Sequence, residues 1–171
     1  MLIDLRSDTV TKPSDRMRVV MSRADVGDDV YQEDPSIKRL EDSAASLLGH
    51  EAGLFVASGT QSNLCALLSH CERGDEYIAG QMAHTYRFEA GGAAALGGIQ
   101  PQPLIFREDG TLDIEEIADA IKPDNFHFAK TRLLCLENTN QGRAIPSSYF
   151  ANVRKLTERN NLSLHLDGAR L

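Results

Sequence analysis

From residue 51 onward, short apolar runs alternate with segments that repeat apolar residues at helical spacing. The runs that predict strands lie at 54–57, 76–79, 102–106, 133–136 and 162–166. The segments that predict helices lie at 60–71, 86–95, 113–121 and 147–159. Strands that alternate with helices favour parallel βαβ units with right-handed crossovers. The pattern therefore predicts an α/β protein with three layers, in which a mostly parallel sheet lies between two layers of helices.

The first 50 residues lack this alternation and predict an extended arm followed by two helices, at 14–23 and 35–48. Asp34-Pro35 is typical of a helix start, and Gly49 of a helix end. Two sets of apolar side chains are expected to face inward, namely Met17, Val20 and Met21 in the first helix and Ile37, Leu40, Ala44, Leu47 and Leu48 in the second. We therefore expect an N-terminal part, 1–50, and a larger domain, 51–171.

The composition is that of an ordinary globular protein, and its charge argues against two classes of partner. Of the 171 residues, 42% are hydrophobic and 25% are charged, and the net charge is −7. Lys and Arg are scattered, which argues against a nucleic-acid or membrane-surface role. The N-terminus lacks the core of a signal peptide and no apolar run approaches a membrane span, so we expect a cytoplasmic protein.

The three cysteines are Cys65, Cys71 and Cys135. Two lie in a helical pattern and one in a strand-like run. An odd number in these settings favours buried free thiols over disulfides or a zinc site, and we expect no metal.

The turn between the first predicted strand and its helix reads Ser58-Gly59-Thr60-Gln61-Ser62. A helix start presents unpaired N–H groups and the positive end of the helix dipole, so it attracts anions. Gly59 allows close approach of the backbone, and the polar side chains add donors. One interpretation is a phosphate site formed by Ser58, Gly59 and Thr60. The alternative is an ordinary capped helix, because Ser and Thr favour that place.

The last predicted strand ends on Asp167, which Gly168-Ala169-Arg170 follows. A carboxylate at a strand end is costly unless it meets a cation or several donors. One interpretation is a structural ion pair with Arg170. The other is a carboxylate that holds a protonated pyridine nitrogen and so strengthens the ring as an electron acceptor. In parallel sheets the site lies at the carboxyl ends of strands, where His84 and Glu137 also fall.

Several segments together resemble the low-specificity L-threonine aldolases, which depend on pyridoxal 5′-phosphate and have the aspartate-aminotransferase fold (fold type I). The resemblance rests on residues 4–11, 26–31, 58–63, 84, 88–92, 136–139 and 165–170, in order and with compatible spacing. It implies cleavage of the β-hydroxy amino acids L-threonine and L-allo-threonine to glycine and acetaldehyde. It also implies a homodimer or homotetramer.

The resemblance implies a role for individual residues. Ser58, Gly59 and Thr60 would hold the phosphate, His84 would stack on the pyridine ring, and Asp167 would hold its nitrogen. Ser7 and Arg170 would hold the substrate carboxylate, for which an Arg offers a bidentate fork. His127 would lie near the β-hydroxyl, Glu89 and Tyr31 would line the site, and Tyr31 would reach the site of a neighbouring subunit. His84 or His127 would take the β-hydroxyl proton.

Two of these residues also have ordinary interpretations. A loop histidine such as His84 is more often a solvated surface residue, and His127 between Phe126 and Phe128 suits packing.

The family's lysine that binds the cofactor covalently has no counterpart in this sequence. The lysines are Lys12, Lys38, Lys122, Lys130 and Lys155, and each is interpreted as a solvated surface charge. The family's C-terminal small domain is also absent. We therefore expect a truncated chain that is inactive alone. The alternatives are another fold type I activity, such as a β-eliminating lyase or alanine racemisation, and a non-catalytic remnant that binds a partner or free cofactor.

Overall fold

The computed structural model describes residues 3–170 and divides into two compact units, with the division between Phe55 and Val56. In the first unit, a single-turn helix η1 (Asp8–Val10) precedes α1 (Asp15–Ser22), and a second, η2 (Asp29–Tyr31), precedes α2 (Pro35–Leu48). Asp34 caps α2 by accepting hydrogen bonds from the backbone N–H of Ser36 and Ile37, both at 2.9 Å. Gly49 ends α2 in the left-handed conformation, as predicted.

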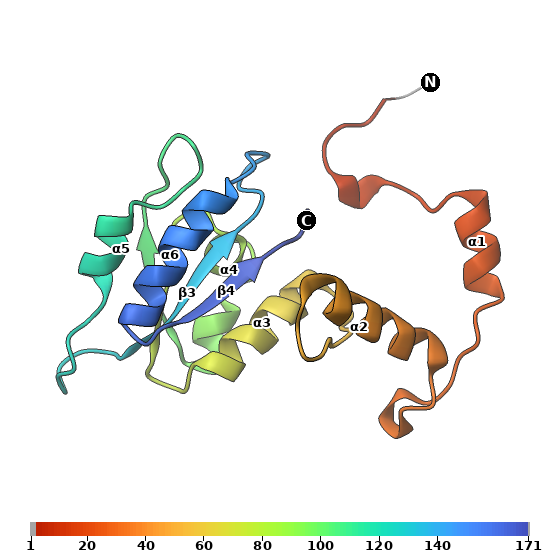
Figure 1. The fold of residues 1–171 in the computed structure, drawn as a ribbon, viewed down its shortest axis with the longest axis horizontal. Coiled ribbons are helices and arrows are strands. Elements are labelled where there is room, and N and C mark those ends of the chain that lie inside the picture. The colour runs from red at the N-terminus through yellow and green to blue at the C-terminus, as the bar shows by residue number, and fades with distance from the viewer. Residues whose placement is uncertain (1–2, 171) are drawn as a thin grey trace. The chain divides into compact units, whose positions relative to one another are not determined.

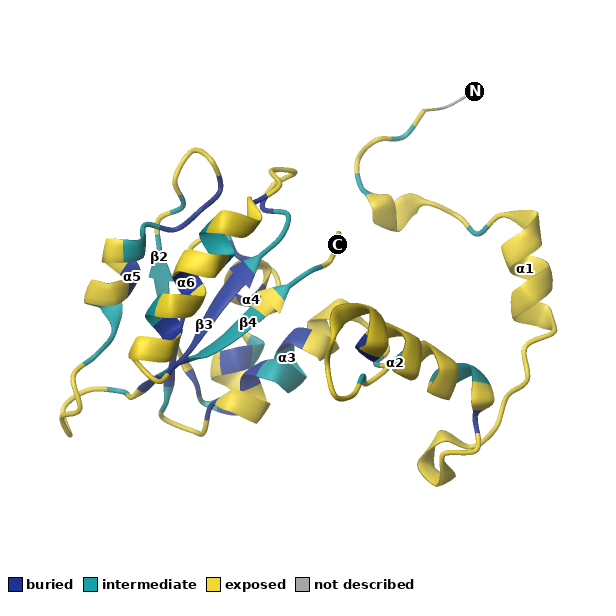
Figure 2. Cartoon of the chain, viewed as in Figure 1, coloured by how far each residue is buried: buried dark blue, intermediate teal, exposed yellow. Residues whose placement is uncertain are grey.

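The apolar faces predicted to be buried in these two helices are largely exposed, so that prediction was wrong. Met17, Val20 and Met21 are each more than half exposed, and α1 contains no buried residue. In α2 only Ala45 is buried, while Leu47 is 86% exposed. The helical period was correct, but Figure 2 shows both helices coloured mostly as exposed, so the described residues of the first unit leave these faces uncovered.

The second unit contains a four-stranded parallel sheet in the order β2-β1-β3-β4, which confirms the predicted α/β class. The strands are β1 (Glu76–Gly80), β2 (Gln100–Leu104), β3 (Thr131–Glu137) and β4 (Ser163–Asp167). The chain crosses between them through α4 (His84–Arg87), a π-helical turn η3 (Ala93–Gly97), α5 (Ile114–Ala120) and α6 (Ser147–Arg159), and α3 (Gly59–His70) precedes the sheet (Figure 1).

Alternate residues of the central strands belong to two cores, one on each face of the sheet. On the face that α3 and η3 cover, the core is Leu67, Cys71, Tyr77, Ala79, Ala83, Ala93, Ile99, Leu133 and Cys135. On the face that α5 and α6 cover, it is Ile78, Leu112, Ile117, Leu134, Leu136 and Val153. The sheet is therefore a middle layer, as the sequence predicted.

The predicted strand at 54–57 does not form. The N–H of Phe55 donates to Glu41 Oε1 at 2.7 Å, and the N–H of Ala57 donates to Gln61 Oε1 at 3.0 Å. Side chains thus take the donors that a strand ladder would need, and Leu54 is 75% exposed.

Two other elements differ in their limits. The predicted 102–106 strand is β2, two residues earlier, at an edge of the described sheet, where Pro101 and Pro103 are tolerated. The predicted 86–95 helix is divided into α4 and η3, because Ala90 and Gly91 adopt left-handed backbone, with φ of 53° and 66°.

The three cysteines are free, and Cys71 and Cys135 are buried as predicted, while Cys65 is half-buried. Burial raises the pKa of Cys71 to about 11 and raises that of Cys135 as well. Both thiols are therefore protonated at neutral pH and are poor nucleophiles. Within residues 3–170, none of the helices combines the length and apolar character that crossing a bilayer requires.

A buried ion pair lies at the amino edge of the sheet. The fully buried Glu76 accepts hydrogen bonds from Gln100 Nε2 at 2.9 Å and Thr131 Oγ1 at 3.0 Å, and its Oε1 lies 3.4 Å from Lys122 Nζ. The same ammonium donates to Gln102 Oε1 and to the carbonyl of Ala120, both at 3.0 Å. The interpretation of Lys122 as a solvated surface lysine was therefore wrong.

Candidate active site

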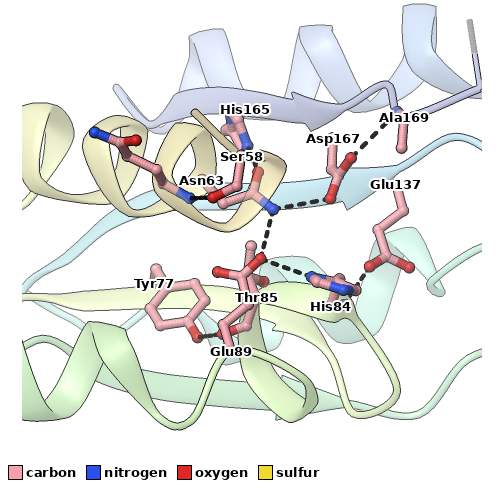
Figure 3. Close-up of polar contacts among 11 residues, drawn as sticks. Ser58, Asn63, Tyr77, His84, Thr85, Glu89, Glu137, His165, Asp167 and Ala169 are labelled. Atoms are coloured by element: carbon pink, nitrogen blue, oxygen red, sulfur yellow. Dashed lines mark hydrogen bonds and ion pairs between the residues drawn. The ribbon is translucent and has the colours of Figure 1, made fainter. Parts of the chain in front are cut away.

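The candidate site lies at the carboxyl edge of the sheet, on the face that α3 covers. Asp167 ends β4 and is paired in register with Glu137, which ends β3. Because side chains alternate along a strand, His165 shares a face with Asp167. Asn63 of α3 contacts both residues, as Figure 3 shows. The site therefore combines two strand ends with the start of one helix.

The first turn of α3 presents backbone donors at this edge. Ser58 Oγ accepts from the N–H of Gln61 at 3.1 Å, and Gln61 Oε1 accepts from the N–H of Ala57, a reciprocal cap. The N–H groups of Gly59 and Thr60 precede the first intrahelical bond and have no acceptor within the described chain. A Cβ built on Gly59 would meet no described atom within 4 Å. The Ser58 side chain thus caps the helix, as the alternative interpretation of an ordinary capped helix expected. The N–H groups of Gly59 and Thr60 remain available to an anion.

Asn63 joins two carboxylates through one amide group. Its Nδ2 donates to Glu89 Oε1 at 2.8 Å and to Asp167 Oδ2 at 2.9 Å. Its Oδ1 lies 2.9 Å from His165 Nε2. Asn63 is 4% exposed and Glu89 is also buried. The Asp167 carboxylate receives a further hydrogen bond from the N–H of Ala169 at 3.2 Å.

His84 lies on the solvent side of this network. Its Nδ1 lies 2.7 Å from Glu89 Oε1, and its side chain is 49% exposed, whereas that of Glu89 is 4% exposed. The backbone N–H of His84 donates to Glu137, whose other oxygen accepts from Asn140 Nδ2 at 2.9 Å. The ring of His84 is thus fixed at one nitrogen and accessible elsewhere.

Burial shifts two titratable groups of the site in opposite directions. It raises the pKa of Glu137, and the nearby Asp167 carboxylate adds to this effect, while hydrogen bonds from His84 and Asn140 oppose it. Burial also lowers the pKa of His165, although the charge of Asp167 opposes the shift. His165 is therefore neutral at pH 7.

The neutral His165 is expected to make folding stability depend on pH. Its folded-state pKa lies below the ordinary 6.5, so below that pH the unfolded chain binds a proton that the folded chain excludes. The part of the unfolding free energy that depends on neutral His165 should be fully present above about pH 6.5. It should be lost as the pH falls through the lowered pKa of His165. Urea unfolding at about pH 7.5 and about pH 5.5 measures this loss. The loss should shrink in His165→Gln, and an equal loss in both proteins would contradict the assignment.

Of the other residues predicted for the site, one lies at the opposite edge of the sheet and two belong to the first unit. His127 is exposed in the loop that leads into β3, so it lies at the amino edge of the sheet, opposite Asp167. Its ring contacts that of Phe126, with centroids 3.9 Å apart, but Phe126 is itself 90% exposed, so this contact is not the core packing of the alternative interpretation. Ser7 accepts hydrogen bonds from Thr9 N and Oγ1 in the first unit, where Tyr31 is 75% exposed. The site roles of Ser7, Tyr31 and His127 stay predictions.

The cations of the second unit are distributed unevenly around the site. Arg170 is exposed in the turn that follows Asp167. Among the described lysines of this unit, Lys122 and Lys130 lie at the amino edge and Lys155 lies on α6, which covers the opposite face. Residues 3–170 contain no group of three His, Cys, Asp or Glu side chains able to hold a metal ion.

Sequence reasoning assigned no role to Asn63 or His165. Asn63 stands four residues after Gly59, which places it one helical turn further along the same side of α3. His165 stands two residues before Asp167 and therefore shares its face. These two spacings were available signals, but only the packing of α3 on β4 makes them meaningful.

The fold of the second unit is that of the pyridoxal-phosphate-dependent fold type I class. A family model described as beta-eliminating lyase matches residues 4–171, so the chain belongs to the β-eliminating lyase family. It is 58% identical over 170 residues to the low specificity L-threonine aldolase of Escherichia coli, covering 99% of this chain and 51% of that protein.

Two further relatives agree. The chain is 45% identical over 175 residues to the probable low-specificity L-threonine aldolase 2 of Arabidopsis thaliana, covering 99% of this chain and 49% of that protein. The solved threonine aldolase of Leishmania major matches with a TM-score of 0.75 and 25% identity, over 91% of this chain and 45% of that one. The chain thus spans about half the length of the curated relatives it matches.

The donor set of the site fits pyridoxal phosphate, on which this family depends. The Gly59 and Thr60 amides suit a phosphate, and no side chain occupies the space beside Gly59 among the described residues. Asp167, fixed by Asn63 and Ala169, suits a protonated pyridine nitrogen. All of these groups lie on the α3 face of the sheet.

Proposed function

We propose that this chain is the cofactor-binding part of an aldehyde-lyase that cleaves L-threonine and L-allo-threonine to glycine and acetaldehyde. The observation that carries the proposal is the hydrogen bond of 2.9 Å from Asn63 Nδ2 to Asp167 Oδ2. It ties the carboxylate to the helix whose first turn offers the Gly59 and Thr60 amides. One small molecule with an anionic tail and a basic ring nitrogen would satisfy both.

In this proposal Ser58, Gly59 and Thr60 form the phosphate end of the site, and His84 faces the ring. Asp167 is the partner of the ring nitrogen. Bound pyridoxal phosphate supplies an electron-accepting ring for the electron pair released when the Cα–Cβ bond breaks. Asp167 keeps that nitrogen protonated, because an adjacent carboxylate favours the charged form of a base.

His84 is the proposed base for the β-hydroxyl proton. A carboxylate accepts hydrogen bonds, so Glu89 selects the His84 tautomer with the proton on Nδ1. Nε2 then carries a lone pair and can take a proton. This arrangement supports His84 over His127, because His127 lies at the opposite edge of the sheet in the same chain. Arg170 and Ser7 are proposed to hold the substrate carboxylate.

We propose a homodimer or homotetramer in which Tyr31 reaches a neighbouring subunit's site; its exposed ring suits such a contact. The three free thiols suit the reducing cytoplasm. Sedimentation of the protein expressed from the complete coding sequence measures the assembly, and a monomer would rule out the proposed role of Tyr31.

Cofactor binding and product analysis test the function. The purified 171-residue chain is expected to bind pyridoxal phosphate without a covalent bond to lysine and to release no acetaldehyde from threonine. The protein from the complete coding sequence should release glycine and acetaldehyde. The family model favours a second candidate, β-elimination, which would yield pyruvate and ammonia from suitable amino acids. Finding those products instead would replace the aldolase proposal.

Removing the phosphate from the ligand tests the α3 end of the site. Pyridoxal lacks the anion that the Gly59 and Thr60 amides would bind, so we expect its affinity for the chain to be weaker than that of pyridoxal phosphate by more than about tenfold. Absorbance titration measures both dissociation constants. Inorganic phosphate should compete with pyridoxal phosphate but not with pyridoxal. Equal affinities for the two ligands would exclude the phosphate role of α3.

A further inference from the structure

Asn63 has an orientation that its neighbours dictate. Two carboxylates, Glu89 and Asp167, lie on one side of its amide, and both can only accept when ionised. The side-chain nitrogen must face them, because an amide oxygen there would meet two negatively charged acceptors. The oxygen therefore faces His165.

The opposite side of the amide then fixes the tautomer of His165. Asn63 Oδ1 accepts hydrogen bonds, so the proton of the neutral imidazole lies on Nε2. Burial favours this neutral form, because it lowers the pKa of His165. His165 lies on β4 two residues before Asp167, and its Nε2–H donates to the Asn63 amide oxygen on the side away from the two carboxylates.

We infer that Asn63 and His165 form a positioning pair that sets the place of two site carboxylates at once: Asp167 for the cofactor nitrogen and Glu89 for His84. The inference rests on the proposed function. Neither Asn63 nor His165 needs to touch the cofactor or the substrate. Asn63 satisfies one oxygen of each carboxylate and leaves the second oxygen of Asp167 with the Ala169 N–H.

The network also links the two ends of the proposed chemistry. Oε1 of Glu89 receives the Asn63 amide and lies 2.7 Å from His84 Nδ1, so a single carboxylate oxygen joins the proposed base to the helix. Loss of the amide donor would leave Glu89 buried with one partner fewer. Both the His84 orientation and the Asp167 position would then loosen together.

Three variants test the inference. Asn63→Leu removes the amide at nearly constant shape, and His165→Met removes the Nε2 donor. His165→Gln is the matched control, because its amide nitrogen can donate from the place of Nε2. The readouts are the dissociation constant for pyridoxal phosphate and the 15N resonance of the bound pyridine nitrogen, which reports protonation of the ring and would not respond to a merely structural role.

In the wild-type chain the bound ring nitrogen should be protonated at neutral pH. In Asn63→Leu the dissociation constant should rise about tenfold to a hundredfold, and the resonance should move toward the unprotonated position. His165→Met should raise the dissociation constant and move the resonance in the same direction. In His165→Gln the dissociation constant should lie within about threefold of the wild-type value, and the resonance should stay at the protonated position. If Asn63→Leu does not fold, the Met and Gln variants of His165 carry the test.

Failure of the inference and failure of the proposed function give different results. Wild-type chain that binds no pyridoxal phosphate would overturn the function. In that case the imidazole 15N resonances of the cofactor-free protein decide the inference. The positioning pair requires His165 to carry its proton on Nε2, and a proton on Nδ1 would overturn the inference. Wild-type affinity and a protonated ring in both Asn63→Leu and His165→Met would also overturn it.

Discussion

Replacing Asp167 with Asn is expected to weaken the binding of pyridoxal phosphate to this chain by about tenfold to a hundredfold. A hydrogen bond between charged partners contributes about 1.5–3 kcal/mol, and the neutral amide keeps the shape but loses the charge that protonates the ring nitrogen. Asn63 Nδ2 and the N–H of Ala169 donate to different oxygens of Asp167, so the single Asn oxygen can accept from only one of them, and circular dichroism should verify that the fold persists. Absorbance titration measures the affinity, and in the complete protein threonine cleavage should fall at least as much.

Asp119→Asn is the matched control for that change. It removes the same charge from an exposed position of α5, which packs against the opposite face of the sheet. Its affinity for pyridoxal phosphate should equal that of the wild type. If Asp167→Asn bound the cofactor within about threefold of the wild type, Asp167 would instead be the structural carboxylate of the alternative interpretation.

Replacing Lys122 with Met is expected to destabilise the second unit by about 3 kcal/mol. The change leaves the fully buried Glu76 without its cation, and breaking a buried pair by removing one partner typically costs about 3–5 kcal/mol. The lower end of that range applies because the Lys122 side chain is 24% exposed and the carboxylate keeps its bonds from Gln100 and Thr131. Urea unfolding followed by circular dichroism measures the change.

Two further variants separate the ion pair from simple loss of a lysine. Lys155→Met on the exposed side of α6 should change the unfolding free energy by less than about 0.5 kcal/mol. Glu76→Gln combined with Lys122→Met should recover more than half of the loss, because no buried charge then remains. A loss below about 1 kcal/mol for Lys122→Met alone would mean that water reaches Glu76.

The layers of the fold were predictable, because period-2 and period-3.6 patterns depend only on which side chains must be buried. The run at 54–57 misled the prediction for the same reason: it is apolar but exposed, and Glu41 and Gln61 bind its backbone. The helices of the first unit show the limit again. Leu47 and Met21 have the right spacing for a buried face, yet both side chains are exposed.

The site was predictable where a charged or turn-forming residue interrupts an apolar pattern in the sequence. Asp167 closes an apolar strand, and Ser58-Gly59-Thr60 interrupts one pattern and starts another. Asn63 and His165 give no such signal, because an Asn within a helix and a His within a strand are common. Their roles appear only when β4 packs beside α3, which brings together atoms more than a hundred positions apart in the sequence. Lys122 was misjudged for the same reason.

Helix α3 carries both the amides at Gly59 and Thr60 and, one turn later, the side chain that holds Asp167. Any sliding or tilting of this helix against the sheet would displace both anchoring points by correlated amounts. Substitutions beneath the helix, for example at the buried Leu67, should therefore alter cofactor retention and ring protonation in step. Substitutions beneath α6 should alter neither property. The core on the α6 face of the sheet should therefore tolerate more substitutions than the core on the α3 face.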